Sequence, residues 1–238
     1  MSRAATTARG LPVAKTLIAL NVLAFVYINR QADSRLGPGG FVRVGPEYKF
    51  TLNAPAIAPC GQWFRIITSG FVHFDPMHLA FNMLILYVVA NVLEREAGSL
   101  RFALIYATSL VTGALDALLS NPGSHTGGAS GAVFGVAGAA TVLMMRRGST
   151  FWNTGFGPLL IINLLYTFVN PNVSLGGHVG GLVGGLICGA ILLRDEPTRS
   201  EKYVGIAAVL GMLVLAFGAC LVVADRAPDL PNCHLYLP

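Results

Sequence analysis

The sequence predicts an all-α polytopic membrane protein. Three observations lead to this class: 54% of the 238 residues are hydrophobic, only 11% are charged, and the mean hydropathy is +0.63. A typical soluble domain has about 25% charged residues, so this chain has too few charges to give its apolar side chains a water-compatible surface. The composition therefore excludes a disordered chain, a nucleic-acid-binding arm and an ordinary cytosolic enzyme.

Seven apolar runs are long enough to cross about 30 Å of hydrocarbon as helices. The first includes an apolar stretch, residues 17–28, that follows Arg3, Arg9 and Lys15, as the apolar region of a signal peptide would. Residues 29–31 offer no small-residue cleavage site, so we expect a retained span. The predicted spans are residues 13–29, 77–95, 100–120, 128–146, 155–172, 177–193 and 203–224.

We expect residues 1–238 to form a single membrane domain. The segment between the first two spans is rich in Pro, Gly and aromatic residues, which indicates an ordered or membrane-resting loop. The parts are a tail (1–12), a six-span bundle (13–193) with an outside loop (30–76), an extra span (203–224) and an outside tail (225–238).

The distribution of Lys and Arg predicts the orientation. With the N-terminus in the cytoplasm, the short inside loops carry the cations, and the outside loops at 121–127 and 173–176 carry none. The C-terminus then lies outside. The absence of an Arg- and Ser-rich transit peptide favours a bacterial cytoplasmic (inner) membrane over an organelle. The inside cations are Arg3, Arg9, Lys15, Arg95, Arg101, Arg146, Arg147, Arg194, Arg199 and Lys202.

Strongly polar side chains inside predicted spans are candidate functional residues, because burying them in hydrocarbon is costly. Spans two, four and six run in the same direction, and each has polar groups near its outer end. These groups should therefore lie at similar depth. The polar residues are His78 and Asn82 on span two, Asp116 on three, Ser130 on four, Asn163 and Tyr166 on five, and His178 on six.

Ser130 and His178 are the residue types that nucleophilic catalysis requires. A serine hydroxyl is a poor nucleophile until a positioned base takes its proton. An imidazole can be that base, since its ordinary pKa is about 6.5. We expect no Asp or Glu near Ser130, His178, His78 or Asn82, which predicts a Ser-His dyad rather than a triad.

The surroundings of Ser130 predict an oxyanion-binding site. Ser130 should begin a helix, so its backbone N–H has no intrahelical acceptor and lies at the positive end of the helix dipole. His78 and Asn82 are four residues apart and share one helix face, where both can donate to a developing negative charge. Gly128 and Gly131 flank the serine and allow a substrate backbone to approach.

Glycine is in excess, with 28 residues or about 12% of the chain against about 7% in typical proteins. Small residues at regular spacing let membrane helices approach closely. If the glycine rows of spans four and six meet, they bring Ser130 and His178 together. The rows are Gly131, Gly135 and Gly138 on span four, and Gly177, Gly181, Gly185 and Gly189 on span six.

Other interpretations of these residues stay open. A serine in a glycine-rich helix, a histidine near a helix end and a His-x-x-x-Asn pair all occur as packing or interhelical hydrogen-bonding groups. Cys60 and Cys233 would both lie outside and can pair in an oxidising compartment, a pairing that we leave open.

The motifs resemble those of the rhomboid family of intramembrane serine proteases. The resemblance covers residues 60–193, and the combination of H-x-x-x-N, G-x-S-G and H-x-x-G is specific. The matching segments are Trp63–Arg65 with Thr68, Phe71–His73, His78–Met83, Glu94, Gly128–Gly135, and Gly177–Gly181 with Gly185.

This resemblance implies a six-helix rhomboid-like bundle plus one C-terminal transmembrane helix. It also implies cleavage of transmembrane segments near the outer face of the bilayer, through an acyl-enzyme. Ser130 would be the nucleophile, His178 the general base, and His78 and Asn82 the oxyanion donors. Phe134 would pack beside His178. The implied supporting positions are Gly128, Gly131, Phe134 and Gly181, with Arg65 stabilising the first outside loop.

The expected partners are transmembrane protein substrates and the lipid bilayer. We expect no nucleic acid, cofactor or metal, and no oligomeric state is predicted. The alternatives are a rhomboid-like pseudoprotease that binds membrane clients, a small polytopic transporter and a structural scaffold. The presence of both Ser130 and His178 disfavours the first, and the absence of a twofold repeat disfavours the second.

Overall fold

Helices make up nearly all of the regular structure. The computed structural model describes residues 10–30, 46–150, 160–165, 173–195, 197–227 and 233. Within these residues, the β pairing is limited to one bridge between Leu52 and Thr126. The long helices are α1 (Pro12–Arg30), α4 (Pro76–Ala97), α5 (Ser99–Ser120), α6 (Ser130–Arg146), α8 (Leu175–Leu192) and α9 (Arg199–Asp225).

The prediction of a multi-pass membrane protein is confirmed. In the described part of the chain, α1, α4, α5, α8 and α9 are long and apolar enough to cross a membrane, and α6 is an apolar helix of 17 residues. The span expected at 155–172 lies largely outside the described residues, although residues 160–165 are helical. Helix α9 begins at Arg199 rather than at residue 203, because Thr198 and Glu201 form a capping box there.

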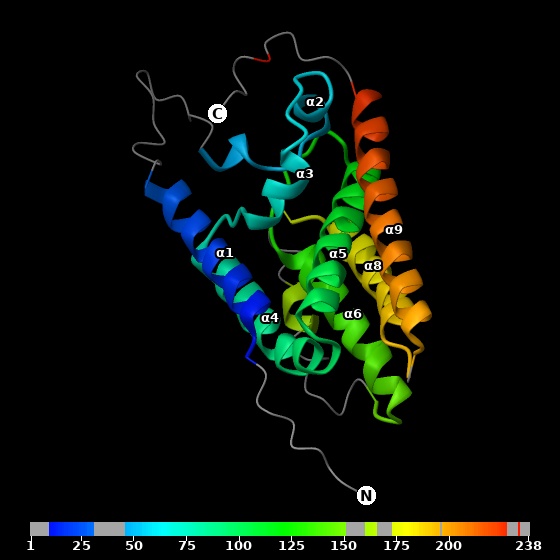
Figure 1. Cartoon of the computed structure of the whole chain (residues 1–238). Coiled ribbons are helices and arrows are strands. Elements are labelled where there is room, and N and C mark those ends of the chain that lie inside the picture. Colours follow the sequence, from blue (N-terminus) through cyan, green and yellow to red (C-terminus); the bar gives the residue numbers. More distant parts are fainter. Residues whose placement is uncertain are drawn as a thin grey trace, which may run out of the picture.

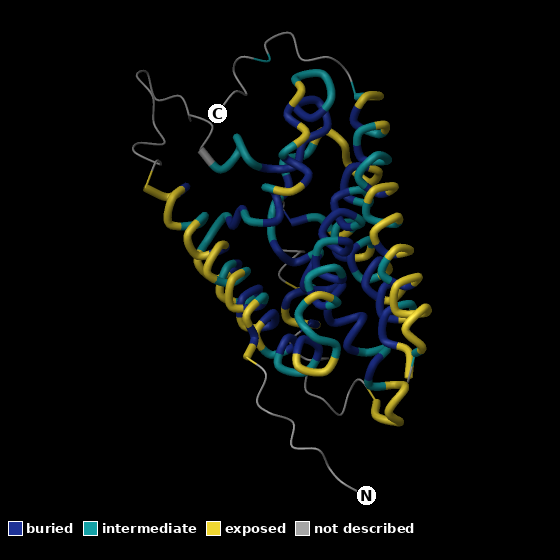
Figure 2. Tube along the Cα trace, in the orientation of Figure 1, coloured by how far each residue is buried: buried dark blue, intermediate teal, exposed yellow. Residues whose placement is uncertain are grey.

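The helices surround a buried centre formed by α5, α6 and α8. Helix α8 packs against both α5 and α6, α5 also contacts α9, and α1 packs along α4 (Figure 1). The outward faces of α1 and α9 are exposed, whereas the centre of the bundle is buried (Figure 2). Leu23 on α1 and Leu215 on α9 are among these exposed apolar side chains, as expected of helices that face lipid.

A structured loop covers one end of the bundle. It contains four short helical turns and is anchored to the segment that leads into α6. Leu52 and Thr126 exchange backbone hydrogen bonds of 2.8 and 3.1 Å, and the Gly128 N–H donates to the Ser69 carbonyl at 2.9 Å. The turns are η1 (Pro46–Lys49), α2 (Ala54–Ile57), α3 (Arg65–Thr68) and η2 (Ser69–Phe71).

Arg65 organises this loop from within. Its side chain is fully buried. Its Nε donates to Gln62 Oε1 at 2.6 Å, and its Nη1 donates to the carbonyls of Tyr48 at 2.7 Å and Thr51 at 2.9 Å. Because a buried guanidinium must satisfy its donors, these bonds fix the path of the loop around one side chain.

Two contacts join the end of α9 to the same loop. A disulfide connects Cys60 to Cys233, with 5.3 Å between the Cα atoms. The Trp63 ring meets the Phe217 ring edge to face at 6.5 Å. Cys233, which follows α9 in the sequence, therefore lies at the loop-covered end of the bundle.

At the opposite end of the bundle, Glu94 near the end of α4 connects this helix to the starts of α1 and α5. This buried carboxylate accepts hydrogen bonds from the Val13 and Ala14 backbone N–H groups, both at 3.0 Å, and from Ser99 Oγ at 2.8 Å. A carboxylate is a favourable partner for the first N–H groups of a helix. Glu94 therefore holds the start of α1 against the turn between α4 and α5.

Candidate active site

Ser130 begins α6 below the loop-covered end of the bundle. At about 1.5 Å per residue, a 17-residue helix is about 26 Å long, whereas the 22 residues of α5 reach about 33 Å. Figure 1 shows α6 starting deeper in the bundle than the end of α5. Ser130 is accordingly buried although it follows a loop. Its N-cap, Ala129, provides no side-chain acceptor, so the first N–H groups of α6 have no intrahelical partner.

Gly128 allows the side chains of His78 and Ser130 to approach the same space next to its backbone. Its backbone has a φ of 135°, which a residue with a side chain rarely adopts. A Cβ placed there would lie 2.8 Å from His78 Nε2 and 3.5 Å from Ser130 Oγ. The absence of a side chain at Gly128 therefore lets the imidazole and the hydroxyl face the same small space.

His78 and Asn82 occupy the first turns of α4 and are both buried. Asn82 Nδ2 donates to the His78 carbonyl at 2.9 Å. The N-cap of α4 is Asp75, whose Oδ1 accepts from the His78 N–H at 2.8 Å. The expectation that no carboxylate lies near the site residues was therefore wrong. Asp75 is at His78 because it ends the loop and caps the helix that presents this histidine.

His178 lies in the first turn of α8 and is buried. Ser174 caps this turn, with its Oγ accepting from the Gly177 N–H at 3.1 Å and its carbonyl accepting from the His178 N–H at 3.2 Å. The Phe134 ring from α6 stacks on the imidazole, with 4.4 Å between centroids and 18° between planes. Stacking against Phe134 and capping by Ser174 together restrict the orientation of His178.

The glycine rows of α6 and α8 pack against each other, as the sequence predicts. A Cβ at Gly181 would collide with the Gly131 carbonyl, and one at Gly185 would collide with the Gly135 carbonyl. A Cβ at Gly131 would lie 3.0 Å from the Gly177 carbonyl oxygen. The backbone that follows Ser130 in α6 is therefore in direct contact with the α8 backbone around His178.

Gly177 meets α6 only through its backbone, whose carbonyl oxygen would lie 3.0 Å from a Cβ at Gly131. A Cβ at Gly177 would point to Ser174 and Ala117, and only its carbonyl faces α6. Helix α8 has a second glycine row that faces α5, and sequence analysis missed it although its four-residue spacing is visible. A Cβ at Gly180 in this row would lie 2.5 Å from the Thr112 carbonyl. The row consists of Gly176, Gly180 and Gly184.

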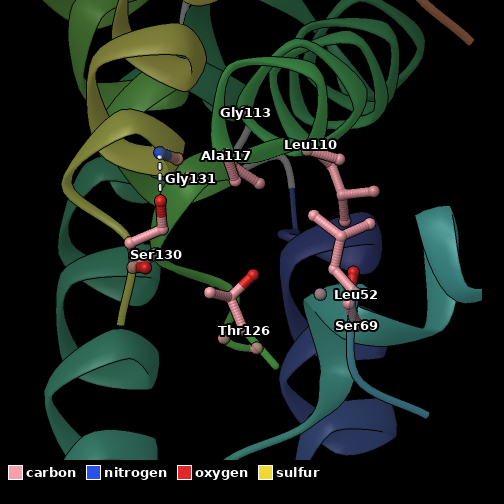
Figure 3. A pocket seen from close by; sticks show the side chains of 15 residues that line it. Leu52, Ser69, Leu110, Gly113, Ala117, Thr126, Ser130 and Gly131 are labelled. Carbon is pink, nitrogen blue, oxygen red and sulfur yellow. Dashed lines mark hydrogen bonds between the residues drawn. The ribbon is translucent and has the colours of Figure 1, made fainter. Parts of the chain in front are cut away.

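A small cavity of about 50 Å³ adjoins Ser130 (Figure 3). Ser130, Gly131 and Gly113 line its bundle side, while Leu52 and Thr126 line its loop side. The labelled side chains in Figure 3 come from the loop, α5 and α6, so the cavity lies where these parts meet. A cavity of this volume has room for water or a small side chain.

The remaining polar candidates lie elsewhere or next to the site. Asp116 packs beside Gly180 of α8, and Asn163 is buried. Tyr166 lies outside the described residues.

His73 is buried in the loop before α4, with its ring 4.9 Å from that of His78. In the described part of the chain, no three His, Cys, Asp or Glu side chains gather as a metal site.

Comparison with known proteins identifies the family. The family model described as "Rhomboid domain" matches residues 60–195, which is more than half of the chain. The chain belongs to the rhomboid family. The matched residues include His78, Asn82, Ser130 and His178 and extend from Cys60 to just beyond the end of α8.

Several curated rhomboid proteins are similar to this chain. Rhomboid protease GluP of Bacillus subtilis is 33% identical over 165 residues, covering 68% of this chain and 31% of GluP. Putative rhomboid protease YdcA of the same organism is 31% identical over 137 residues, covering 56% of this chain and 66% of YdcA. Inactive RHOMBOID-like protein 8 of Arabidopsis thaliana is 28% identical over 154 residues, covering 64% of this chain and 41% of that protein. The chain thus spans from about a third to about two thirds of these relatives.

Proposed function

We propose that this rhomboid protein is an intramembrane serine endopeptidase that uses Ser130 and His178 as a dyad. The observation that carries the proposal is the contact between the glycine rows of α6 and α8. Through this contact, the first turn of α6, which contains Ser130, lies beside the first turn of α8, which contains His178. The Phe134 ring stacks on the His178 imidazole. Similarity to GluP, a named rhomboid protease, adds support.

In the acylation step, His178 takes the proton of the Ser130 hydroxyl as Oγ attacks the scissile carbonyl carbon. The carbonyl oxygen becomes an oxyanion, which the Ser130 N–H, Asn82 Nδ2 and His78 can stabilise. Collapse of this intermediate breaks the C–N bond. The leaving amine takes the proton from His178, and the other half of the substrate stays as an ester on Ser130.

In the deacylation step, water attacks the ester carbonyl while His178 takes its proton. The Ser130 oxygen then leaves and recovers that proton, which releases a carboxylic acid that ionises. Burial of the site within the bundle makes access of water the main physical requirement. The cavity beside Ser130, bounded by Thr126 and Gly113, provides room for this water next to the nucleophile.

The substrates we propose are transmembrane segments of other proteins. A peptide bond in a helix is shielded by its hydrogen bonds, so helix-weakening residues would help a segment extend into the site. We further propose a cytoplasmic N-terminus, a bundle completed by a span at 155–172, and an added seventh span at α9. Ser130 would then act near the outer face of a bacterial inner membrane.

Cleavage of a reporter transmembrane segment by the purified full chain tests this proposal. We expect the wild-type protein to cut the segment, and Ser130→Ala to abolish cleavage. His178→Ala should also lower the rate at least a hundredfold. Ser149→Ala is the matched control, since Ser149 is an exposed serine just beyond the other end of α6. Its activity should equal that of the wild type.

Two outcomes would contradict the proposal. Cleavage that persists in Ser130→Ala would exclude this serine as the nucleophile. Binding of the segment without cleavage by a folded wild-type protein would support the alternative of a pseudoprotease that holds membrane clients. That alternative has one observation in its favour, which is the similarity to Inactive RHOMBOID-like protein 8.

A further inference from the structure

A second cavity lies at the end of the bundle away from Ser130. It has a volume of about 530 Å³ and lies between the turn that joins α4 to α5 and the start of α9. These segments are at the lower end of the bundle in Figure 1, while the loop that contains α2 and α3 is at the upper end. Arg101, Arg199 and Lys202 line the cavity.

These three cations have no carboxylate partner in the part of the chain that the structure describes. The carboxylate that lines the cavity is Glu96, and its Oε2 is already paired with Arg147 Nη2 at 2.8 Å. Arg199 instead lies over the ring of Tyr203, 5.8 Å from its centroid. The cavity therefore has an excess of positive charge that an anion would neutralise.

Glu201 lies close to this cluster, in a smaller neighbouring cavity that Arg101 and Lys202 also line. Its Oε2 accepts hydrogen bonds from the Thr198 N–H at 2.8 Å and Thr198 Oγ1 at 2.7 Å. Glu201 is thus engaged in capping α9. Its carboxylate lowers the excess charge of the neighbourhood without pairing with any cation that lines the larger cavity.

The first turn of α5 adds to the positive potential. Its N-cap, Gly98, has no side chain to accept a hydrogen bond, and Gly98, Ser99 and Leu100 line the cavity. The first N–H groups of a helix have no intrahelical acceptor and lie at the positive end of the helix dipole. The cavity thus combines three cationic side chains with a helix start, an arrangement suited to a phosphate group.

The surroundings of the cavity favour a phosphate that is part of a lipid. The cavity lies where spanning helices begin and end, which is the level of lipid headgroups. Leu100 and Tyr203 at its edge are exposed, as is Val204 on the next position of α9. Further along α9 the apolar side chains of Leu210, Val214 and Leu215 are also exposed, and acyl chains can lie along them.

We propose that this cavity binds the phosphate headgroup of an anionic phospholipid. Arg199 and Lys202 from α9 and Arg101 from α5 hold the phosphate, while the acyl chains follow the outer surface of α9. The bound lipid would link the turn between α4 and α5 to α9. This site is separate from the candidate active site and does not depend on proteolytic activity.

Native mass spectrometry of the full chain in detergent, titrated with phosphatidylglycerol or phosphatidylcholine, tests the site. We expect phosphatidylglycerol to bind at least tenfold more tightly. The double variant Arg199→Gln, Lys202→Gln should weaken phosphatidylglycerol binding about tenfold or more, since each cation near a membrane surface adds about 1 kcal/mol. Arg95→Gln is the matched control, because Arg95 is an exposed cation near the same end of α4 that does not line the cavity. Its binding should change less than twofold.

Three results would overturn the proposal. Equal binding of the two lipids would exclude recognition of an anionic headgroup. Equal loss in Arg95→Gln would indicate general surface attraction rather than a site. Displacement of phosphatidylglycerol by inorganic phosphate at similar concentration would assign the cavity to a soluble anion. Arg199 and Lys202 are exposed, so each single variant should fold. Each therefore gives an independent measurement of phosphatidylglycerol binding.

Discussion

Gly181 on α8 lies directly against the backbone carbonyl of Gly131 on α6, one residue after Ser130. No side chain fits between the two helices at this point. The contact fixes how far His178 is from Ser130, because each residue is in the first turn of its helix. A change of helix separation here would therefore move the nucleophile and the base apart.

Gly181→Ala tests this relationship. The added methyl group would collide with the Gly131 carbonyl, so we expect a loss of about 1–3 kcal/mol of stability from overpacking. We also expect about a hundredfold loss of activity, because a shift of about 1 Å can have that effect on positioned groups. Thermal unfolding in detergent and reporter cleavage measure the two effects.

Gly211→Ala is the control for that variant. Gly211 is also in a spanning helix, but a Cβ there meets nothing within 4 Å. Alanine is the better helix former, so this variant should be neutral or slightly more stable. Equal effects of the two substitutions would show that helix propensity, rather than contact between α6 and α8, determines the outcome.

Arg65→Ala should destabilise the loop that covers the active-site end. The change removes the hydrogen bonds of a buried guanidinium and leaves the Tyr48 and Thr51 carbonyls without this donor. Unsatisfied buried groups cost about 1–3 kcal/mol each, so we expect a loss of at least about 2 kcal/mol in unfolding free energy. Arg65→Lys should recover only part of it, because an ammonium cannot reproduce the planar guanidinium. Stability equal to wild type in Arg65→Ala would contradict this role.

Reduction of the disulfide between Cys60 and Cys233 should lower the melting temperature. Native disulfides contribute about 2–4 kcal/mol in typical cases, and this one joins positions 173 residues apart. A non-reducing peptide map should contain the cross-linked pair. In Cys60→Ser, dithiothreitol should no longer change the melting temperature. A reducible shift that remains in this variant would have to come from another pair of cysteines.

The burial of His73 predicts that the folded protein loses stability in mild acid. Burial lowers the pKa of His73 to about 3, and the neighbouring His78 acts in the same direction. Below about pH 6.5, the unfolded chain therefore binds a proton that the folded protein does not bind. Each further pH unit then lowers the unfolding free energy by up to about 1.4 kcal/mol, until the pH approaches the folded pKa. The contribution is fully present above pH 6.5 and is lost as the pH falls.

The measurement is the unfolding free energy at pH 7 and pH 5 for the wild type and His73→Asn. The wild type should lose about 2 kcal/mol more than the variant over this interval. Other groups also titrate in acid, so the comparison rests on the difference between the two proteins. Identical pH dependence would show that His73 is not the residue responsible.

The helices and the candidate site could be predicted because they depend on local properties of the chain. Hydrophobic length indicated α1, α4, α5 and α9 within a few residues. Equal depth of polar groups on parallel spans singled out His78, Ser130 and His178. Four-residue glycine spacing predicted the contact between α6 and α8, since only small residues permit so close an approach.

The loop contacts could not be predicted, because they join residues far apart in the sequence. Neither the pairing of Leu52 with Thr126 nor the bonds from Arg65 to two carbonyls leaves a periodic pattern. Asp75 was overlooked at His78 because its function there is helix capping, which depends on where α4 begins. The predicted topology allows Cys60 to pair with Cys233, but whether the two sulfurs meet depends on contacts far apart in the sequence.

Mapping of a fluorophosphonate adduct tests whether His178 activates Ser130 as a nucleophile. The reagent is attacked by a serine that a base activates, so it does not require the natural substrate. We expect one adduct, on Ser130, that forms at least a hundredfold more slowly in His178→Ala, while Ser149→Ala reacts like wild type. An adduct on another serine, or equal rates in wild type and His178→Ala, would contradict it.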